Sequence, residues 1–174
     1  VIHTLGRALA SDLFIFAQEC WKLENFQIVS QEDLRRLVAG ARAVRRRAYA
    51  PYSGYPVGAA LLTRGGQVHT GCNVENATYG LTICAERVAV FKALSEGARK
   101  FPRIAVAADT GVLTPPCGAC RQTLAEFARE LPIRLVAADG AVPARHTSLD
   151  ALLPDWRKTP PAICVPAKRD EFRL

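Results

Sequence analysis

The stretch LTICAERVAV (residues 81–90) places a thiol at Cys84, a carboxylate at Glu86 and a guanidinium at Arg87 inside a mostly apolar segment. Its apolar residues predict the start of a buried helix over residues 84–96. Buried ionisable groups are costly unless they are paired or bind a metal ion. The stretch therefore predicts a functional site at the beginning of this helix.

Helices and strands are expected to alternate on both sides of this stretch. Ser30, followed by acidic residues, predicts the N-cap of the first helix, and the Arg64-Gly-Gly-Gln67 turn predicts a β-hairpin. The other expected elements are a helix to about residue 48, strands at 57–63, 68–74, 104–109 and 133–139, a helix at 118–129 and a short helix near 148–153. This order predicts an α/β sandwich with a mixed sheet covered by helices.

Length and composition predict an ordinary globular protein. The chain has 174 residues, of which 49% are hydrophobic and 22% charged, enough for one domain with its own core. The apolar runs are too short to cross a bilayer and no secretion signal is evident. We therefore expect a cytoplasmic protein with reduced thiols and without a membrane partner.

The formal net charge of +7 raises the question of a nucleic-acid partner. No aromatic residues interleave with the basic ones, as a stacking surface for bases would require. Six arginines fall on the first predicted helix and are interpreted as its solvated face: Arg35, Arg36, Arg42, Arg45, Arg46 and Arg47. The sequence therefore favours a protein that does not bind nucleic acid.

Three cysteines have the spacing of a metal site. Cys117 and Cys120 are three residues apart at a predicted helix start, and Cys84 is the natural third ligand because it begins another helix. A catalytic zinc ion takes three protein ligands and leaves one position for water. Glu86 would then reach the open side of the ion and move a proton, while Arg87 would offset the excess negative charge.

Three alternatives stay open at this point. Cys117 and Cys120 have the spacing of a thioredoxin-like redox pair. A structural zinc ion would need a fourth ligand, for which Cys72 is the nearby candidate. Glu86 and Arg87 would in the third alternative form a surface ion pair, although their apolar surroundings argue against it.

Four stretches carry a resemblance to a known family. The pair Cys84-Ala-Glu86 and Pro116-Cys-Gly-Ala-Cys120 fits the all-cysteine form of the zinc deaminase signature. The four stretches are PYSGYPVGAA (51–60), GCNVENATYG (71–80), LTICAER (81–87) and PCGACRQ (116–122). With them the chain resembles the small, three-cysteine cytidine deaminases of nucleoside salvage, over about residues 32–156.

The resemblance implies a fold, an assembly and a reaction. The implied fold is a three-layer α/β/α sandwich around a mixed five-stranded sheet, in a homotetramer with shared active sites. The implied reaction is zinc-dependent deamination of cytidine and 2′-deoxycytidine to uridine and 2′-deoxyuridine, with Cys84, Cys117 and Cys120 as zinc ligands and Glu86 as the proton carrier. The domain organisation expected on this basis is an N-terminal extension (1–30), a catalytic domain (31–160) and a C-terminal tail (161–174).

The resemblance also implies how the nucleoside is bound. Asn73 and Glu75 would bind the ribose hydroxyls, and Tyr79 would reach the site of a neighbouring subunit. Tyr55 stands where the family usually has Phe, and would stack on the pyrimidine. Arg87 would hydrogen-bond the cysteine thiolates.

Some family features differ in this chain. Thr78 stands where Ser is more usual, and Trp156 stands near the position of a C-terminal Phe that closes the neighbouring site, one residue closer to the preceding Pro. A deaminase of a modified cytosine nucleoside, of the blasticidin S type, is the main alternative. From other classes, a zinc-stabilised binding protein or a redox protein would carry the same cysteines.

Overall fold

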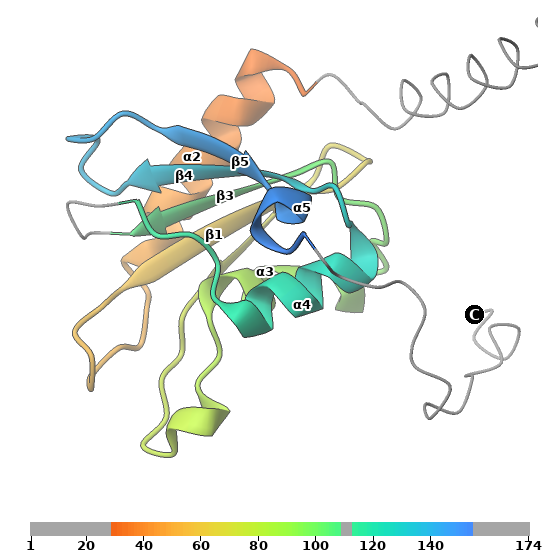
Figure 1. Ribbon diagram of the computed structural model, residues 1–174. Coiled ribbons are helices and arrows are strands. Elements are labelled where there is room, and N and C mark those ends of the chain that lie inside the picture. The colour runs from red at the N-terminus through yellow and green to blue at the C-terminus, as the bar shows by residue number, and fades with distance from the viewer. Residues whose placement is uncertain (1–28, 109–112, 155–174) are drawn as a thin grey trace, which may run out of the picture.

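The computed structural model describes residues 29–108 and 113–154 of the 174-residue chain. Five strands form one mixed sheet in the order β2-β1-β3-β4-β5 (Figure 1). Only β3 and β4 pair in parallel, and the other neighbours pair antiparallel. The strands are β1 (Val57–Leu62), β2 (Val68–Cys72), β3 (Arg103–Ala108), β4 (Pro132–Ala137) and β5 (Arg145–Ser148).

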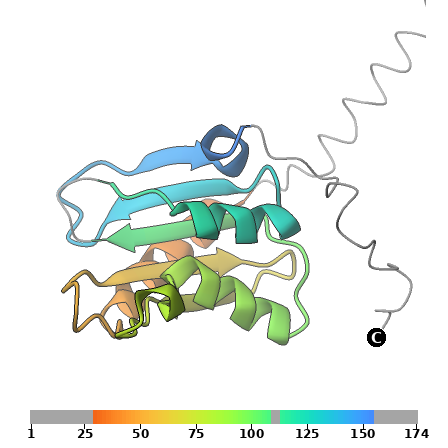
Figure 2. The ribbon, with the colours of Figure 1, turned by 60° about the horizontal axis from the view of Figure 1, so that its bottom comes forward.

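Helices cover both faces of the sheet, so the expected three-layer sandwich is confirmed (Figure 2). The helices are α2 (Gln31–Arg45), α3 (Ala85–Ser95), α4 (Gly118–Phe127) and α5 (Leu149–Leu152), with a 3₁₀ turn η1 (Tyr79–Leu81). Helix α2 lies on one face, whereas α3 and α4 lie on the other.

The alternation of side chains along the strands separates two apolar cores. Ile104 and Val106 of β3 pack in the core under α3 and α4, whereas the intervening Ala105 packs in the core under α2. Successive residues of a strand point to opposite faces, so one strand serves both cores. Strands buried on both faces are continuous apolar runs, as in VGAALL of β1.

Two glycines allow the helices to approach the sheet closely. A Cβ on Gly58 would lie 2.1 Å from the Ala41 carbonyl oxygen of α2, and a Cβ on Gly71 would lie 2.4 Å from the Ala89 nitrogen of α3. Both contacts are with backbone atoms, which cannot move aside. Glycine at these positions therefore sets the spacing between layers.

The bounds of the predicted elements differ by a few residues from the observed ones. Ser30 caps α2 as predicted, since its hydroxyl accepts a hydrogen bond from the Asp33 amide. The helix ends at Arg45 rather than near residue 48, because the next amides bond to carbonyls three residues back and tighten the chain into turns. Strand β5 was not predicted as a separate element. No helix in the described ranges is long and apolar enough to cross a membrane.

Candidate active site

Two helix N-termini bring three cysteines together. Cys84 is the N-cap of α3 and Cys117 is the N-cap of α4, while Cys120 lies in the first turn of α4. The Cys117 Sγ atom lies 3.8 Å from Cys84 Sγ and 3.5 Å from Cys120 Sγ, and all three sulfur atoms are within 4.8 Å of one another. Three sulfurs bound to one tetrahedral zinc ion at its usual bond length lie about 3.8 Å apart. The three thiols therefore fit one zinc ion.

The surroundings of Cys84 favour its thiolate form. The pKa of Cys84 is lowered to about 5, mainly because its sulfur accepts a hydrogen bond from Cys120 and further because Arg87 lies beside it. The Cys120 thiol supplies that hydrogen bond and its pKa is raised accordingly. Thiolates are the form in which cysteine binds metal, so the lowered pKa of Cys84 favours metal binding.

Glu86 lies beside the cysteines and is almost fully buried, with 4% of its surface exposed. The pKa of Glu86 is raised to about 7, mainly by burial; its own backbone amide opposes the shift, and the Cys84 charge contributes to it. A carboxyl group with a pKa near neutrality both accepts and releases protons under ordinary conditions. Its place in a buried helix argues against the surface ion pair with Arg87.

Arg87 and Arg121 hold the segments around the thiols. The Arg87 guanidinium donates to the Thr82 carbonyl at 2.9 Å and to Cys84 Sγ at 3.7 Å. Arg121 donates to the Pro116 carbonyl at 2.7 Å and to the Leu152 carbonyl at 3.0 Å. Sequence reasoning predicted the contact of Arg87 but gave no role to Arg121, whose partners lie on two separate segments.

Cys72 does not belong to this cluster. The only group of three or more potential ligands found among the described residues consists of Cys84, Cys117 and Cys120. Cys72 is the last residue of β2 and is half-buried. The alternative of a four-cysteine structural site therefore finds no support in the described part of the chain.

Asn73 and Glu75 lie at the end of β2, where they organise the neighbouring loop. The buried Asn73 amide accepts a hydrogen bond from the Val57 nitrogen at 2.7 Å and donates to the Tyr55 carbonyl at 2.9 Å. The Glu75 carboxylate accepts hydrogen bonds from the amides of Tyr52 and Ser53 and from the Ser53 hydroxyl. These bonds lower the pKa of Glu75, with the Ser53 hydroxyl as the main cause.

Tyr55 is linked to the segment that precedes α4. Its hydroxyl lies 2.7 Å from the Thr114 hydroxyl, so the polar group that distinguishes Tyr from Phe has a partner. Thr114 is three residues before Cys117. The loop that carries Tyr55 and the loop that carries a candidate ligand are therefore joined.

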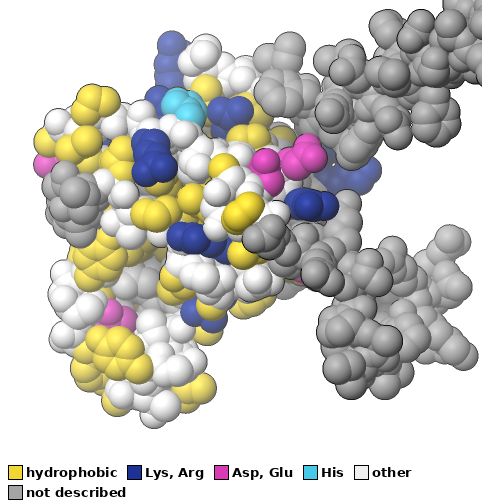
Figure 3. Space-filling model, in the orientation of Figure 1, with side chains coloured by type: hydrophobic (Ala, Val, Ile, Leu, Met, Phe, Trp, Pro, Cys, Tyr) yellow, Lys and Arg dark blue, Asp and Glu magenta, His cyan; other side chains and the backbone are white. Residues whose placement is uncertain are grey.

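Tyr79 is strongly exposed to solvent. It lies on the loop between β2 and α3, which projects at the bottom of Figure 1, and 72% of its surface is exposed. The base of this loop is held by two backbone hydrogen bonds between Val74 and Ile83. Figure 3 shows apolar side chains gathered over this projection. Trp156 lies outside the described residues.

Three thiols that fit one zinc ion, with a buried glutamate beside them, match the residue signature of the zinc deaminases. Residues 31–133 match the family model described as the cytidine and deoxycytidylate deaminase zinc-binding region. The chain belongs to this family.

Known relatives agree with this assignment. The chain is 47% identical over 123 residues to a cytidine deaminase of Sporosarcina psychrophila, covering 70% of this chain and 89% of the relative. A crystal structure of cytidine deaminase from Burkholderia pseudomallei matches with a TM-score of 0.66 and 49% identity, covering 70% of this chain and 96% of that one. The cytidine deaminase of Mycobacterium tuberculosis matches with a TM-score of 0.61 and 42% identity, covering 71% and 95%. The redox and binding-protein alternatives are therefore set aside in favour of an enzyme.

Proposed function

We propose that this enzyme hydrolyses the 4-amino group of cytidine and 2′-deoxycytidine, giving uridine or 2′-deoxyuridine and ammonia, as a step of pyrimidine salvage. The observation that carries the proposal is the placement of Glu86, buried beside three thiols and with a pKa of about 7. A redox pair formed by Cys117 and Cys120 would leave the third thiol, Cys84, without a role, and it does not itself require a buried carboxyl group. Hydrolytic deamination needs one, because protons must move from water to the base.

Cys84, Cys117 and Cys120 would hold the zinc ion. The distances between their sulfur atoms and the lowered pKa of Cys84 support this assignment. When bound, zinc supplies a Lewis acid that makes water a stronger nucleophile. Arg87 would offset the negative charge of the thiolates, as its contact with Cys84 indicates.

Glu86 would carry the protons of the reaction. Its carboxylate would take a proton from the attacking water and deliver it to N3 of the cytosine ring. It would then take the remaining proton from the hydroxyl group added at C4 and deliver it to the amino group, which leaves as ammonia as the C4 carbonyl forms. Its burial excludes bulk water, so these transfers occur between groups held in place.

Asn73 and Glu75 would contact the sugar. Both lie at the end of β2 on the segment that leads to Cys84, and the Glu75 carboxylate is held in position by the loop at residues 52–53. Tyr55 lies on the same loop and would stack on the base, with its hydroxyl held by Thr114. Such fixed polar groups orient a small ligand better than mobile ones.

We further propose a cytoplasmic homotetramer that binds no nucleic acid, with Tyr79 reaching the site of a neighbouring subunit. Support comes from the large apolar side chains that are exposed on and beside the projecting loop. They are Tyr79, Leu81 and Val74. Apolar groups gathered in this way mark protein interfaces. Light scattering after size exclusion would give the subunit number.

Ultraviolet-monitored turnover tests the proposed reaction. Purified protein is assayed with cytidine and with 2′-deoxycytidine, and zinc is counted in the same samples. Wild-type protein and the matched control Glu126→Gln, an exposed residue of α4, should deaminate both nucleosides. Glu86→Gln should keep its zinc and lose activity by about a thousandfold or more.

Two results would contradict the proposal. Full activity of Glu86→Gln would remove the role assigned to this carboxyl group. Zinc-loaded wild-type protein without turnover of either nucleoside would redirect the search to modified cytosine nucleosides.

A further inference from the structure

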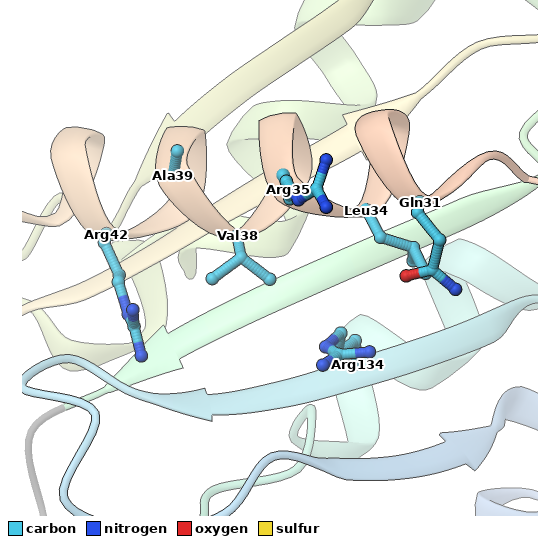
Figure 4. A pocket seen from close by; sticks show the side chains of 7 residues that line it. All are labelled: Gln31, Leu34, Arg35, Val38, Ala39, Arg42 and Arg134. Atoms are coloured by element: carbon cyan, nitrogen blue, oxygen red, sulfur yellow. The ribbon is translucent and has the colours of Figure 1, made fainter.

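A groove lies on the face of the sheet opposite the candidate active site. It runs between α2 and β4, has a volume of about 350 Å³, and is shown from close by in Figure 4. One stripe of α2 forms its upper wall, and Arg134 of β4 forms its floor. The residues that line it are Gln31, Leu34, Arg35, Val38, Ala39, Arg42 and Arg134. Helix α2 packs mainly against β1, β2 and β3, and the groove lies along the side of the helix that faces Arg134 of β4.

The groove and its floor carry an excess of positive charge. Arg134 contacts His146 of β5 at 2.9 Å, and Arg103 on β3 lies close enough to lower the pKa of His146, together with burial and Arg134. Because a guanidinium can only donate, the His146 Nε2 atom must be the acceptor, so this imidazole is neutral. In the described ranges no acidic side chain forms an ion pair with Arg42, Arg103 or Arg134.

We propose that residues 1–28 of this chain dock in the groove, with their acidic side chains facing Arg42, Arg103 and Arg134 and their apolar side chains covering Leu34 and Val38. This segment has a net charge of −1 in a chain of net charge +7. Its charged residues are Asp12, Glu19 and Glu24 against Arg7 and Lys22. It also supplies large apolar side chains, among them Phe14, Phe16, Trp21 and Phe26.

The other end of the chain does not have this complementarity. Residues 155–174 contain five basic and three acidic side chains, for a net charge of +2. A positively charged segment is repelled by a positively charged groove. A second copy of the same face is excluded by the same argument.

The described part of the chain begins beside the groove. Val29 packs against the core under α2, and Gln31, two residues later, is the first residue of the groove wall. A stretch of 28 residues spans about 42 Å as a helix and up to about 90 Å when extended, whereas α2 is about 22 Å long. Every part of the groove is therefore within reach, and docking within one chain needs no second molecule.

Hydrogen–deuterium exchange on the full chain tests the proposal. In the wild type, backbone amides of residues 9–28 should exchange at least about tenfold more slowly than in an unstructured peptide of the same sequence. Arg134→Glu should remove most of this protection, and so should the triple change Asp12→Lys, Glu19→Lys, Glu24→Lys, which leaves the described residues untouched. Lys92→Glu is the matched control, because it makes the same charge change on an exposed residue of α3, on the other face of the sheet.

Each remaining outcome overturns the proposal. Residues 1–28 exchanging as an unstructured peptide in the wild type would show that they do not dock. Protection that survives both charge changes would place them elsewhere. Protection of residues 31–42 by added inorganic phosphate, while residues 1–28 exchange freely, would make the groove an anion site.

Discussion

The side-chain hydroxyls of Tyr55 and Thr114 are 2.7 Å apart, although 59 residues separate them in the sequence. The contact joins the segment before β1 to the segment before α4. It links a residue proposed to stack on the base with the loop that carries Cys117, so it bears on both substrate binding and stability.

Removing either hydroxyl should abolish the hydrogen bond between Tyr55 and Thr114. Tyr55→Phe and Thr114→Val should each lower the free energy of unfolding by about 1 kcal/mol, and the double variant should lose little more than either alone. Urea unfolding of the zinc-loaded protein measures this coupling. Fully additive losses would show that the two hydroxyls act independently. Deamination should persist in Tyr55→Phe, because the ring remains.

Asn73 should be needed for folding as well as for binding sugar. Asn73→Ala leaves the Val57 amide and the Tyr55 carbonyl without their side-chain partner at a buried position, so the free energy of unfolding should fall by about 3 kcal/mol. Urea unfolding measures the loss. The matched control is Asn76→Ala, whose exposed side chain bonds only within its own loop and should change stability by less than about 1 kcal/mol. Equal effects of the two would contradict the structural role.

Gly71 should not tolerate a side chain. Gly71→Ala would place a Cβ 2.4 Å from the Ala89 nitrogen, forcing α3 away from the sheet and lowering stability by about 2 kcal/mol or more. Thermal unfolding should show a fall in Tm of about 5 °C or more. Gly80→Ala is the control, since a Cβ there meets nothing within 4 Å and should leave Tm unchanged. A Tm for Gly71→Ala equal to that of the control would refute the close contact.

His146 should make the protein less stable in mild acid. Burial, with Arg134 and Arg103 nearby, lowers the pKa of His146 below its usual 6.5, so the unfolded chain binds the proton more readily. The contribution of the neutral His146 imidazole to the free energy of unfolding is therefore present above the pKa of the unfolded chain. It is lost as the pH falls below about 6.5, because the unfolded chain then takes up the proton first. Urea unfolding from pH 7.5 to 5.5 should show a steeper loss for wild type than for His146→Gln, whose amide oxygen still accepts from Arg134. Parallel curves would contradict the lowered pKa.

Replacing Cys84 should weaken zinc binding, whereas replacing Cys72 should not. Cys84→Ala removes one of three clustered sulfurs and should weaken zinc binding by at least about a hundredfold. Cys72→Ala, outside the cluster, should bind zinc as the wild type does. Competition with a chromophoric chelator measures both affinities, and similar losses in the two variants would refute the assigned ligand set.

The positions of the helices and the clustering of the three cysteines were predictable from the sequence. Ser30 marked the start of α2, and Cys84 and Cys117 were each expected at a helix start, because caps and breaks leave local signals. Strand β5 (Arg145–Ser148) left no such signal. It is short, its first two residues are exposed, and its place depends on pairing with β4.

Hydrogen bonds between segments far apart in the chain could not be predicted from the sequence either. Nothing near Glu75 indicates that its carboxylate accepts hydrogen bonds from the amides of Tyr52 and Ser53, more than twenty positions earlier. Arg121 likewise binds the carbonyls of Pro116 and Leu152, which only the folded chain brings together. Such contacts follow from the path of the chain, and local residue patterns do not encode that path.

The placement of Cys84 and Cys117 at two helix starts has a consequence for the life of the protein in a cell. An ion held by both acts as a removable cross-link between α3 and α4, closing a loop of more than thirty residues. Its binding free energy is then part of the free energy of folding. The amount of folded enzyme should track the supply of metal, so a shortage would reduce its abundance as well as its activity.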